Sequence, residues 1–254
     1  MSFRVAGLAL LLLAAAPPPA NPTAADLVAR NLAARGGDAA LAAIQSLDFA
    51  GKYIAPGDFQ MTYHATRLRD PGGDRMRDDL AIQGLTIVQA FDGHGAWKIN
   101  PFAGRKDAET MSADEARAQA DAARIDGVLL AARNDGSAVR YLGREDFDGT
   151  LGYKVQVRQR DGDQYDVLLD PDAMLEIRAT ETRSVRGAPT VTEYEYGDYE
   201  KVAGVYYPMS IDSWQPASPD QRSRIMIATA TANSPLDPAS FVAPLTTAKS
   251  PKTR

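Results

Sequence analysis

The feature that most constrains the fold is a long succession of short segments in which apolar and polar residues alternate, over residues 47–232. In residues 59–68, for example, apolar or aromatic side chains occupy the odd positions up to 65 and polar side chains the even ones. This period of two is typical of antiparallel strands with one dry face and one wet face. Because helices do not recur between the segments, an α/β fold is excluded and a mainly β (α+β) protein is predicted.

Turn residues such as Pro56-Gly57 and Pro71-Gly72-Gly73 divide this region, and Asp161-Gly162 is a strong hairpin signal. We expect about ten to eleven strands, joined mostly as a meander. The predicted strands are residues 47–54, 59–68, 75–82, 85–91, 96–100, 151–160, 164–170, 175–183, 190–199, 205–214 and 223–232.

Helical signals are confined to three places. Thr23 is a plausible N-cap for a helix over Ala24–Arg35, and a short helix over Ala39–Ile44 follows the Gly-Gly pair. A helical insert over Ser112–Arg124 begins with the Ser-x-x-Glu spacing of a capping box. The apolar patch Val128–Leu130 follows, and we expect Met111–Leu130 to form a lid over one end of the sheet.

Residues 1–22 have the pattern of a secretory signal peptide. Arg4 precedes the apolar stretch Val5–Ala16, and cleavage is expected between Ala20 and Ala25. The apolar stretch is shorter than the about 20 residues that a membrane-spanning helix requires, which favours a removable leader over an N-terminal membrane anchor. We therefore expect an exported, periplasmic, soluble protein.

Composition narrows the class further. The chain has no cysteine, so neither a disulfide nor a lipid on a cysteine after the leader is expected. The net charge of −5 disfavours nucleic-acid binding. Residues 23–245 are predicted to form a single domain, and residues 246–254, which are polar and basic, a disordered tail.

The sequence does not predict an enzyme. Its two histidines, His64 on the polar face of a strand and His94 in the turn Asp92–Gly95, have no patterned partner for a metal. Neither a Gly-x-Ser-x-Gly elbow nor a phosphate-binding glycine loop occurs. The clusters Arg67–Arg69 and Arg75–Arg77, like the carboxylates on the strands, are interpreted as solvated faces. We expect no catalytic residue, metal or cofactor.

Five stretches resemble the bacterial LolA/LolB group of exported proteins related to outer-membrane lipoprotein sorting. They indicate a fold more than an activity, because their residues are typical of turns and of a protein core. The stretches are DLVARNLAARGGDAALAAIQSLDFAGKY, TIVQAFDGHGAWKINPFAG, Gly143–Val157, DYEKVAGVYYPMSI and Asp237–Pro244.

This resemblance implies an incomplete, strongly curved antiparallel β-barrel with a helical lid over an apolar cavity. It implies a monomeric carrier of acyl chains of a lipid or lipoprotein, with an inner-membrane donor and an outer-membrane acceptor. The family's carriers lock the lid with an arginine. Arg117, Arg124 and Arg133 are candidates here, and the role is assigned to none of them.

Strand parity predicts which residues line the cavity, with Trp97 as an aromatic part of its wall. A packed core would use the same residue types, and a shift of one residue would turn any strand's side chains to the other face. A lipid-sensing domain and a structural envelope protein without a ligand remain alternatives to the carrier. The predicted lining residues are Met61, Tyr63, Ile87, Phe91, Trp97, Leu129, Leu130, Tyr153, Val155, Val167, Ile177, Tyr194 and Met226.

Overall fold

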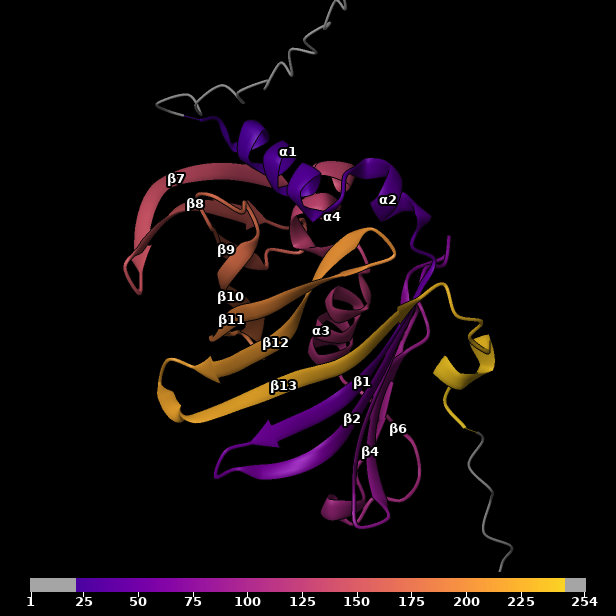
Figure 1. Ribbon diagram of the computed structural model, residues 1–254. Coiled ribbons are helices and arrows are strands. Elements are labelled where there is room, and N and C mark those ends of the chain that lie inside the picture. Colours follow the sequence, from indigo (N-terminus) through magenta and orange to yellow (C-terminus); the bar gives the residue numbers. More distant parts are fainter. Residues whose placement is uncertain (1–21, 245–254) are drawn as a thin grey trace, which may run out of the picture.

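The computed structural model describes residues 22–244; residues 1–21 of the predicted signal peptide and the predicted tail lie outside this range. The described strands form one 13-stranded sheet in the order β6-β5-β4-β3-β2-β1-β13-β12-β11-β10-β9-β8-β7. All neighbours are antiparallel, and the sheet curves strongly (Figure 1). Because β6 and β7 are edge strands at opposite ends of this order, the barrel is not closed.

Loops of a few residues connect most of the strands, as the turn signals predict. The strands are β1 (Ser46–Ala55), β2 (Phe59–Leu68), β3 (Arg75–Ile82), β4 (Leu85–Phe91), β5 (Ala96–Ile99), β6 (Glu109–Thr110), β7 (Ala138–Phe147), β8 (Thr150–Arg158), β9 (Gln164–Leu169), β10 (Glu176–Val185), β11 (Ala188–Val202), β12 (Val205–Gln215) and β13 (Ser218–Ala232).

The predicted helices are present. Thr23 caps α1 through a capping box with Asp26, and Ser112 caps α3 through one with Glu115. These reciprocal bonds satisfy backbone N–H groups that a helix leaves free at its start. Within residues 22–244 the helices are α1 (Ala24–Arg35), α2 (Asp38–Ala43), α3 (Ala113–Ala123) and α4 (Gly127–Asp135), with 3-10 turns η1 (Pro101–Ala103) and η2 (Pro238–Phe241). None of them combines the length and the hydropathy that crossing a membrane requires.

The insert α3–α4 connects the two edges of the sheet. It leaves β6 at one edge and enters β7 at the other, so the chain must cross the open side of the curve between them. In Figure 1, α3 lies inside this curve, and α1, α2 and α4 lie at its upper end. We call the face toward the helices concave and the opposite face convex.

The main hydrophobic core lies between α1, α2 and α4 and the concave face of β8, β9 and β12. Leu27 and Leu129 are fully buried there against strand residues such as Val155. Burying a side chain of this size contributes about 1.5–3 kcal/mol. A second cluster joins α3, through Ala120 and Ala123, to the concave face of β3–β5.

The structure has two strands and one helix that the sequence did not reveal. In β7 the alternation is interrupted by a register shift between Tyr141 and Gly143, which leaves Leu142 48% exposed. β6 has two residues, too few to show a period. The patch predicted at 128–130 is part of α4, which Gly136 ends in a left-handed conformation.

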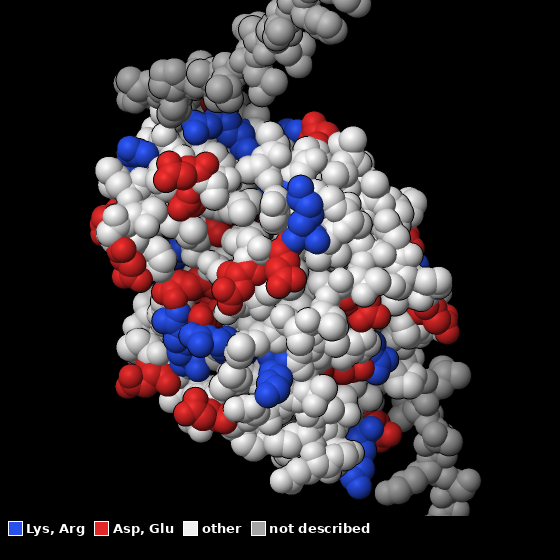
Figure 2. Space-filling model, viewed as in Figure 1, with Lys and Arg blue, Asp and Glu red and all other residues white. Residues whose placement is uncertain are grey.

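The convex face of β3–β5 is covered by η2. Phe241 is fully buried, and the indole N–H of Trp97 donates to its carbonyl oxygen at 2.8 Å. Elsewhere the surface mixes charges: Figure 2 shows acidic and basic side chains interspersed on the viewed face. That face offers no broad basic surface of the kind that nucleic acids bind.

Candidate functional site

A cavity of about 410 Å³ lies under α3, between β3–β4 on one side and β9–β11 on the other. Its wall contains carboxylates, guanidinium groups, amides and tyrosines, which differs from the apolar lining that we predicted. The residues around it are Asp78, Gln89, Ala118, Gln119, Asp121, Ala122, Arg124, Val128, Gln159, Tyr165, Glu181, Arg183, Tyr194 and Tyr196.

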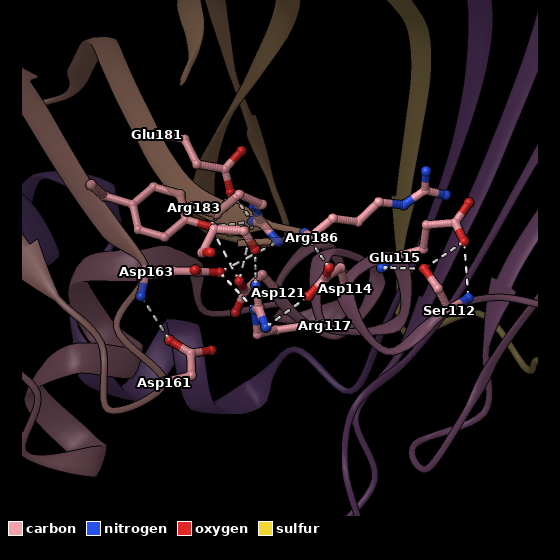
Figure 3. Close-up of polar contacts among 12 residues, drawn as sticks. Ser112, Asp114, Glu115, Arg117, Asp121, Asp161, Asp163, Glu181, Arg183 and Arg186 are labelled. Carbon is pink, nitrogen blue, oxygen red and sulfur yellow. Dashed lines mark hydrogen bonds and ion pairs between the residues drawn. The ribbon is translucent and has the colours of Figure 1, made fainter. Parts of the chain in front are cut away.

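Arg183 of β10 is the centre of a polar network that joins α3 to the sheet (Figure 3). Its Nη2 donates to the hydroxyl oxygen of Tyr165 at 3.0 Å and to Asp121 Oδ2 of α3 at 3.3 Å. The same nitrogen donates to Glu181 Oε1, which also accepts a hydrogen bond from Tyr165. With 9% of the Arg183 side chain exposed, these are charge-assisted bonds largely shielded from water.

Arg117 adds a second connection from α3 to the same side of the sheet. Its Nε donates to Asp163 Oδ2 at 3.1 Å and its Nη2 to the Ser184 carbonyl at 2.7 Å. Asp163 is almost fully buried, in the turn between β8 and β9. The backbone N–H of Arg186 donates to Asp114 at the start of α3. One long side of α3 is therefore fastened along β10 and the β8–β9 turn.

Arg67 of β2 holds α3 from the opposite side. Its Nε donates to the Ala122 carbonyl near the end of the helix at 2.8 Å, and its Nη1 donates to Asp78 Oδ1 at 2.6 Å. Burial lowers the pKa of Arg67, but the charges of Asp78 and Tyr63 and the hydrogen bonds to them together more than offset this and raise the pKa overall. The predicted solvated face is therefore wrong for Arg67, whose side chain is 13% exposed.

Burial also shifts the pKa values of the acidic groups in the network. It raises the pKa of Tyr165 and raises the pKa of Tyr194 to about 12. Burial raises the pKa of Asp121 as well, against the attraction of Arg124 and Arg183. Both tyrosines are therefore neutral at pH 7 and act as hydrogen-bond donors, as Tyr194 does toward Glu181 at 3.0 Å.

Three carboxylates at one end of the network lie within reach of a common cation. Oxygens of Asp121, Asp161 and Asp163 are all within 4.8 Å of one another. Arg183 lies 3.3 Å from Asp121 and 3.5 Å from Asp163, and Arg117 also pairs with Asp163. Since guanidinium groups already neutralise the two more buried carboxylates, the cluster does not require an ion for charge balance.

Beyond the cavity the concave face becomes apolar. Asp78 pairs with Gln89 across β3 and β4, and the next pair on the same face is Leu80 with Ile87. The series ends at the hairpin tip, where Leu85 is 41% exposed. We define the apolar strip as the concave-face residues of β2–β4 that run from the cavity to this rim: Met61, Tyr63, Leu80, Ile82, Leu85 and Ile87.

The predicted lining residues fall into separate regions. Met61, Tyr63 and Ile87 belong to the apolar strip, and Phe91 packs under α3. Tyr194 is the one of the thirteen that lines the cavity. Five others lie together in the main core, under α1 and α4, and are 0–6% exposed: Leu129, Leu130, Tyr153, Val155 and Val167.

The remaining three are on the convex face. Trp97 contacts Val88 and Ala90, whereas its strand neighbour Ala96 packs toward α3. Ile177 borders a convex-face pocket with Glu195 and Asp212, and Met226 is 46% exposed beside the inward Ile227.

Sequence reasoning did not identify the polar members of the site. Arg67, Glu181 and Arg183 alternate with other residues along strands, as solvated residues also do. Of the arginines considered for the lid, Arg117 binds the β8–β9 turn, whereas Arg133 pairs with Asp38 on the surface. No pattern in the sequence marks a strand arginine as lying under a helix.

Several solved structures have this fold. The chain is similar to a domain assigned to outer-membrane lipoprotein sorting from Vibrio parahaemolyticus, with a TM-score of 0.58, 10% identity, and coverage of 85% of this chain and 94% of that one. The chain is also similar to a DUF1329 family protein from Desulfovibrio piger, with a TM-score of 0.60, 13% identity, and coverage of 86% of this chain and 95% of that one. For a LolA superfamily protein from Nitrosomonas europaea, the TM-score is 0.57 and the identity 13%, with coverage of 87% of this chain and 98% of that one.

No protein-family model matches the sequence, and no curated protein matches it. The structural similarity therefore concerns the fold. This chain has the LolA-like fold, a strongly curved antiparallel sheet that does not close, and the resemblance proposed from the sequence is confirmed at that level.

Proposed function

We propose that this chain is an exported, non-catalytic carrier that binds acyl chains of a lipid or lipoprotein. It takes them from an inner-membrane donor and moves them through the periplasm, as a monomer, towards an acceptor at the outer membrane. Residues 1–22 direct export, and residues 23–245 form the binding domain. The observation that carries the proposal is the partly exposed apolar strip on the concave face, in a fold shared with a lipoprotein-sorting domain.

The strip suits an acyl chain because its side chains are apolar apart from the Tyr63 hydroxyl, and because its outer end, at Leu85, is open. Each methylene removed from water contributes about 0.8 kcal/mol. Covering about six methylenes would contribute about 5 kcal/mol, close to the lower estimates of the entropy lost on association, so that useful binding requires a longer chain or further contacts. Affinity should therefore rise steeply with acyl-chain length.

The polar network supports carriage and not catalysis. Its tyrosines are protonated at pH 7, and its carboxylates are held by Arg67, Arg117 and Arg183. These contacts fix α3 beside the strip. Loading and release of a bulky cargo would require α3 to move, since the helix packs on the same concave face.

The first test is native mass spectrometry of the mature protein purified from a periplasm, followed by organic extraction. A discrete extra mass that extracts as a lipid is expected. A fluorescent fatty-acid probe then locates the site. Ile87→Gln, in the strip, should weaken probe binding about tenfold, equivalent to about 1.4 kcal/mol. Ile54→Gln is the matched control, because Ile54 is half-buried on the convex face opposite Gln60 and Arg224.

A protein without extra mass that also takes up no probe would contradict the carrier. That outcome would favour a structural envelope protein with a packed interior. Equal effects of the two isoleucine substitutions would show that the probe binds somewhere other than the strip.

A further inference from the structure

We propose that the cavity under α3 binds the polar headgroup of the cargo, and that this headgroup is neutral or zwitterionic and both donates and accepts hydrogen bonds. The inference rests on the proposed carrier function and specifies its ligand as an amphiphile. The headgroup occupies the cavity while the acyl chain lies on the apolar strip.

Two buried polar atoms of the cavity wall lack a hydrogen-bond partner within residues 22–244. Gln159 is 6% exposed, and its Oε1 accepts no hydrogen bond from any residue in 22–244. Nη1 of Arg183 likewise donates none within the described chain, although it lies 3.5 Å from Asp163 Oδ2. Buried polar groups are nearly always hydrogen-bonded in native proteins. Both atoms are covered in this structure, and a ligand that donates to Gln159 and accepts from Arg183 would satisfy both once these side chains rotate toward the cavity that they line.

The charges around the cavity balance without a ligand. Arg67 pairs with Asp78 at 2.6 Å, Arg124 with Asp121 at 3.3 Å, and Arg183 with Glu181. Each lining carboxylate thus has a guanidinium partner. A headgroup with net charge would enter this shielded space without a counter-charge, which is costly, whereas a neutral or zwitterionic one would not.

The position of the cavity matches an amphiphile. Along β3 and β4 the concave face passes from Met76 and Phe91 under α3, to the cavity pair Asp78 and Gln89, and then directly to the strip. A headgroup in the cavity therefore places the first part of its chain against Leu80. The cavity volume of about 410 Å³ lies within the range of about 300–1,000 Å³ that is common for small-molecule sites.

The test compares ligands that share one chain and differ in headgroup. Binding of lysophosphatidylethanolamine, lysophosphatidylglycerol and palmitate to the mature protein is measured by calorimetry, below their micelle-forming concentrations. The zwitterionic lysophosphatidylethanolamine is expected to bind at least tenfold more tightly than the two anions. Glycerophosphoethanolamine, the headgroup without a chain, should bind at least 100-fold more weakly than the lysolipid.

Gln159→Leu removes the unpartnered amide oxygen and should weaken lysophosphatidylethanolamine binding about tenfold, equivalent to about 1.4 kcal/mol, while leaving palmitate binding unchanged. Gln156→Leu is the control, because Gln156 lies on the opposite face of β8 and bonds to Asp166. Thermal unfolding verifies that each variant folds. If Gln159→Leu does not, Gln89→Leu on the opposite wall of the cavity replaces it.

Three results would overturn the inference. Equal affinity for the three lipids, unaffected by Gln159→Leu, would exclude a headgroup site but leave the carrier intact. Tight binding of glycerophosphoethanolamine alone would mean that the cavity serves a free solute. Failure of every lipid to bind would contradict the carrier function itself.

Discussion

The hydrogen bond from Arg67 to α3 allows a quantitative test of how the helix is held. Arg67→Leu keeps most of the apolar volume of the side chain and removes the donor to the Ala122 carbonyl, at 2.8 Å. A hydrogen bond from a charged donor contributes about 1.5–3 kcal/mol. Local opening of α3 should become easier by that amount, which corresponds to about 10- to 150-fold.

Hydrogen-exchange mass spectrometry of residues 113–123 measures this opening. The control is Arg77→Leu on the adjacent strand: Arg77 also pairs with a carboxylate, Asp79, and donates to a carbonyl, that of Ser240, but on the convex face. It should accelerate exchange near η2 and leave α3 unchanged. Local exchange of α3 is the quantity measured, because Arg117 and Arg183 still attach the helix to the sheet when Arg67 is replaced.

A second substitution separates the two partners of Arg67. Arg67→Leu leaves the Asp78 carboxylate without its counter-charge, and adding Asp78→Leu removes that penalty. The double variant should recover global stability, whereas exchange of α3 should stay fast because the bond to Ala122 is still missing. Unchanged exchange of α3 in both variants would refute the claim that Arg67 holds the helix.

Two further predictions concern local structure. Hydrogen bonds from Lys98 and then from the Ser112 backbone and hydroxyl lower the pKa of Glu115 to about 2. The ionised Glu115 therefore stabilises the fold at pH values above its unfolded pKa of about 4.3. This contribution is under about 1 kcal/mol, because the side chain is 45% exposed. It is lost as the pH falls from about 4.3 to about 2. Chemical denaturation should show that Glu115→Gln is less stable than the unsubstituted protein above this range and equally stable at its lower end. A difference in stability that persists at pH 2 would contradict the lowered pKa of Glu115. Gly51→Ala would place a Cβ 1.9 Å from the Met226 carbonyl oxygen and should lower the free energy of unfolding by about 1–3 kcal/mol, measured by thermal unfolding. Gly95→Ala is the control: its Cβ would meet nothing within 4 Å, so the unfolding midpoint should change little.

Local elements followed closely from local chemistry. The N-cap residue Thr23 and the capping-box spacing at Ser112 located the starts of α1 and α3, because helix caps depend on residues within one turn of the chain. The alternation in β2 and β8 was sufficient to identify strands and their two faces. Interrupted or very short elements, such as β7 and β6, could not be found in this way, since a bulge or a length of two residues removes the period.

The faces of individual strands were harder to assign. Ile177 lies in β10 at a register shift between Glu176 and Arg178, and a similar shift at Gly51 lies beside Met226 in β13. Each irregularity changes which side chains share a face. For β5, alternation alone leaves both orientations open, and packing against η2 turns Trp97 to the convex side.

The sequence by itself determined the class of fold and the start of each capped helix, because these depend on residues close together in the chain. Only the tertiary structure decided that Asp78, Gln159 and Glu181 surround one cavity. A strand with polar residues on one face has the same pattern whether water or a helix covers that face. Here α3 covers it because the insert must join two edge strands at opposite ends of the sheet, an arrangement set by long-range strand pairing.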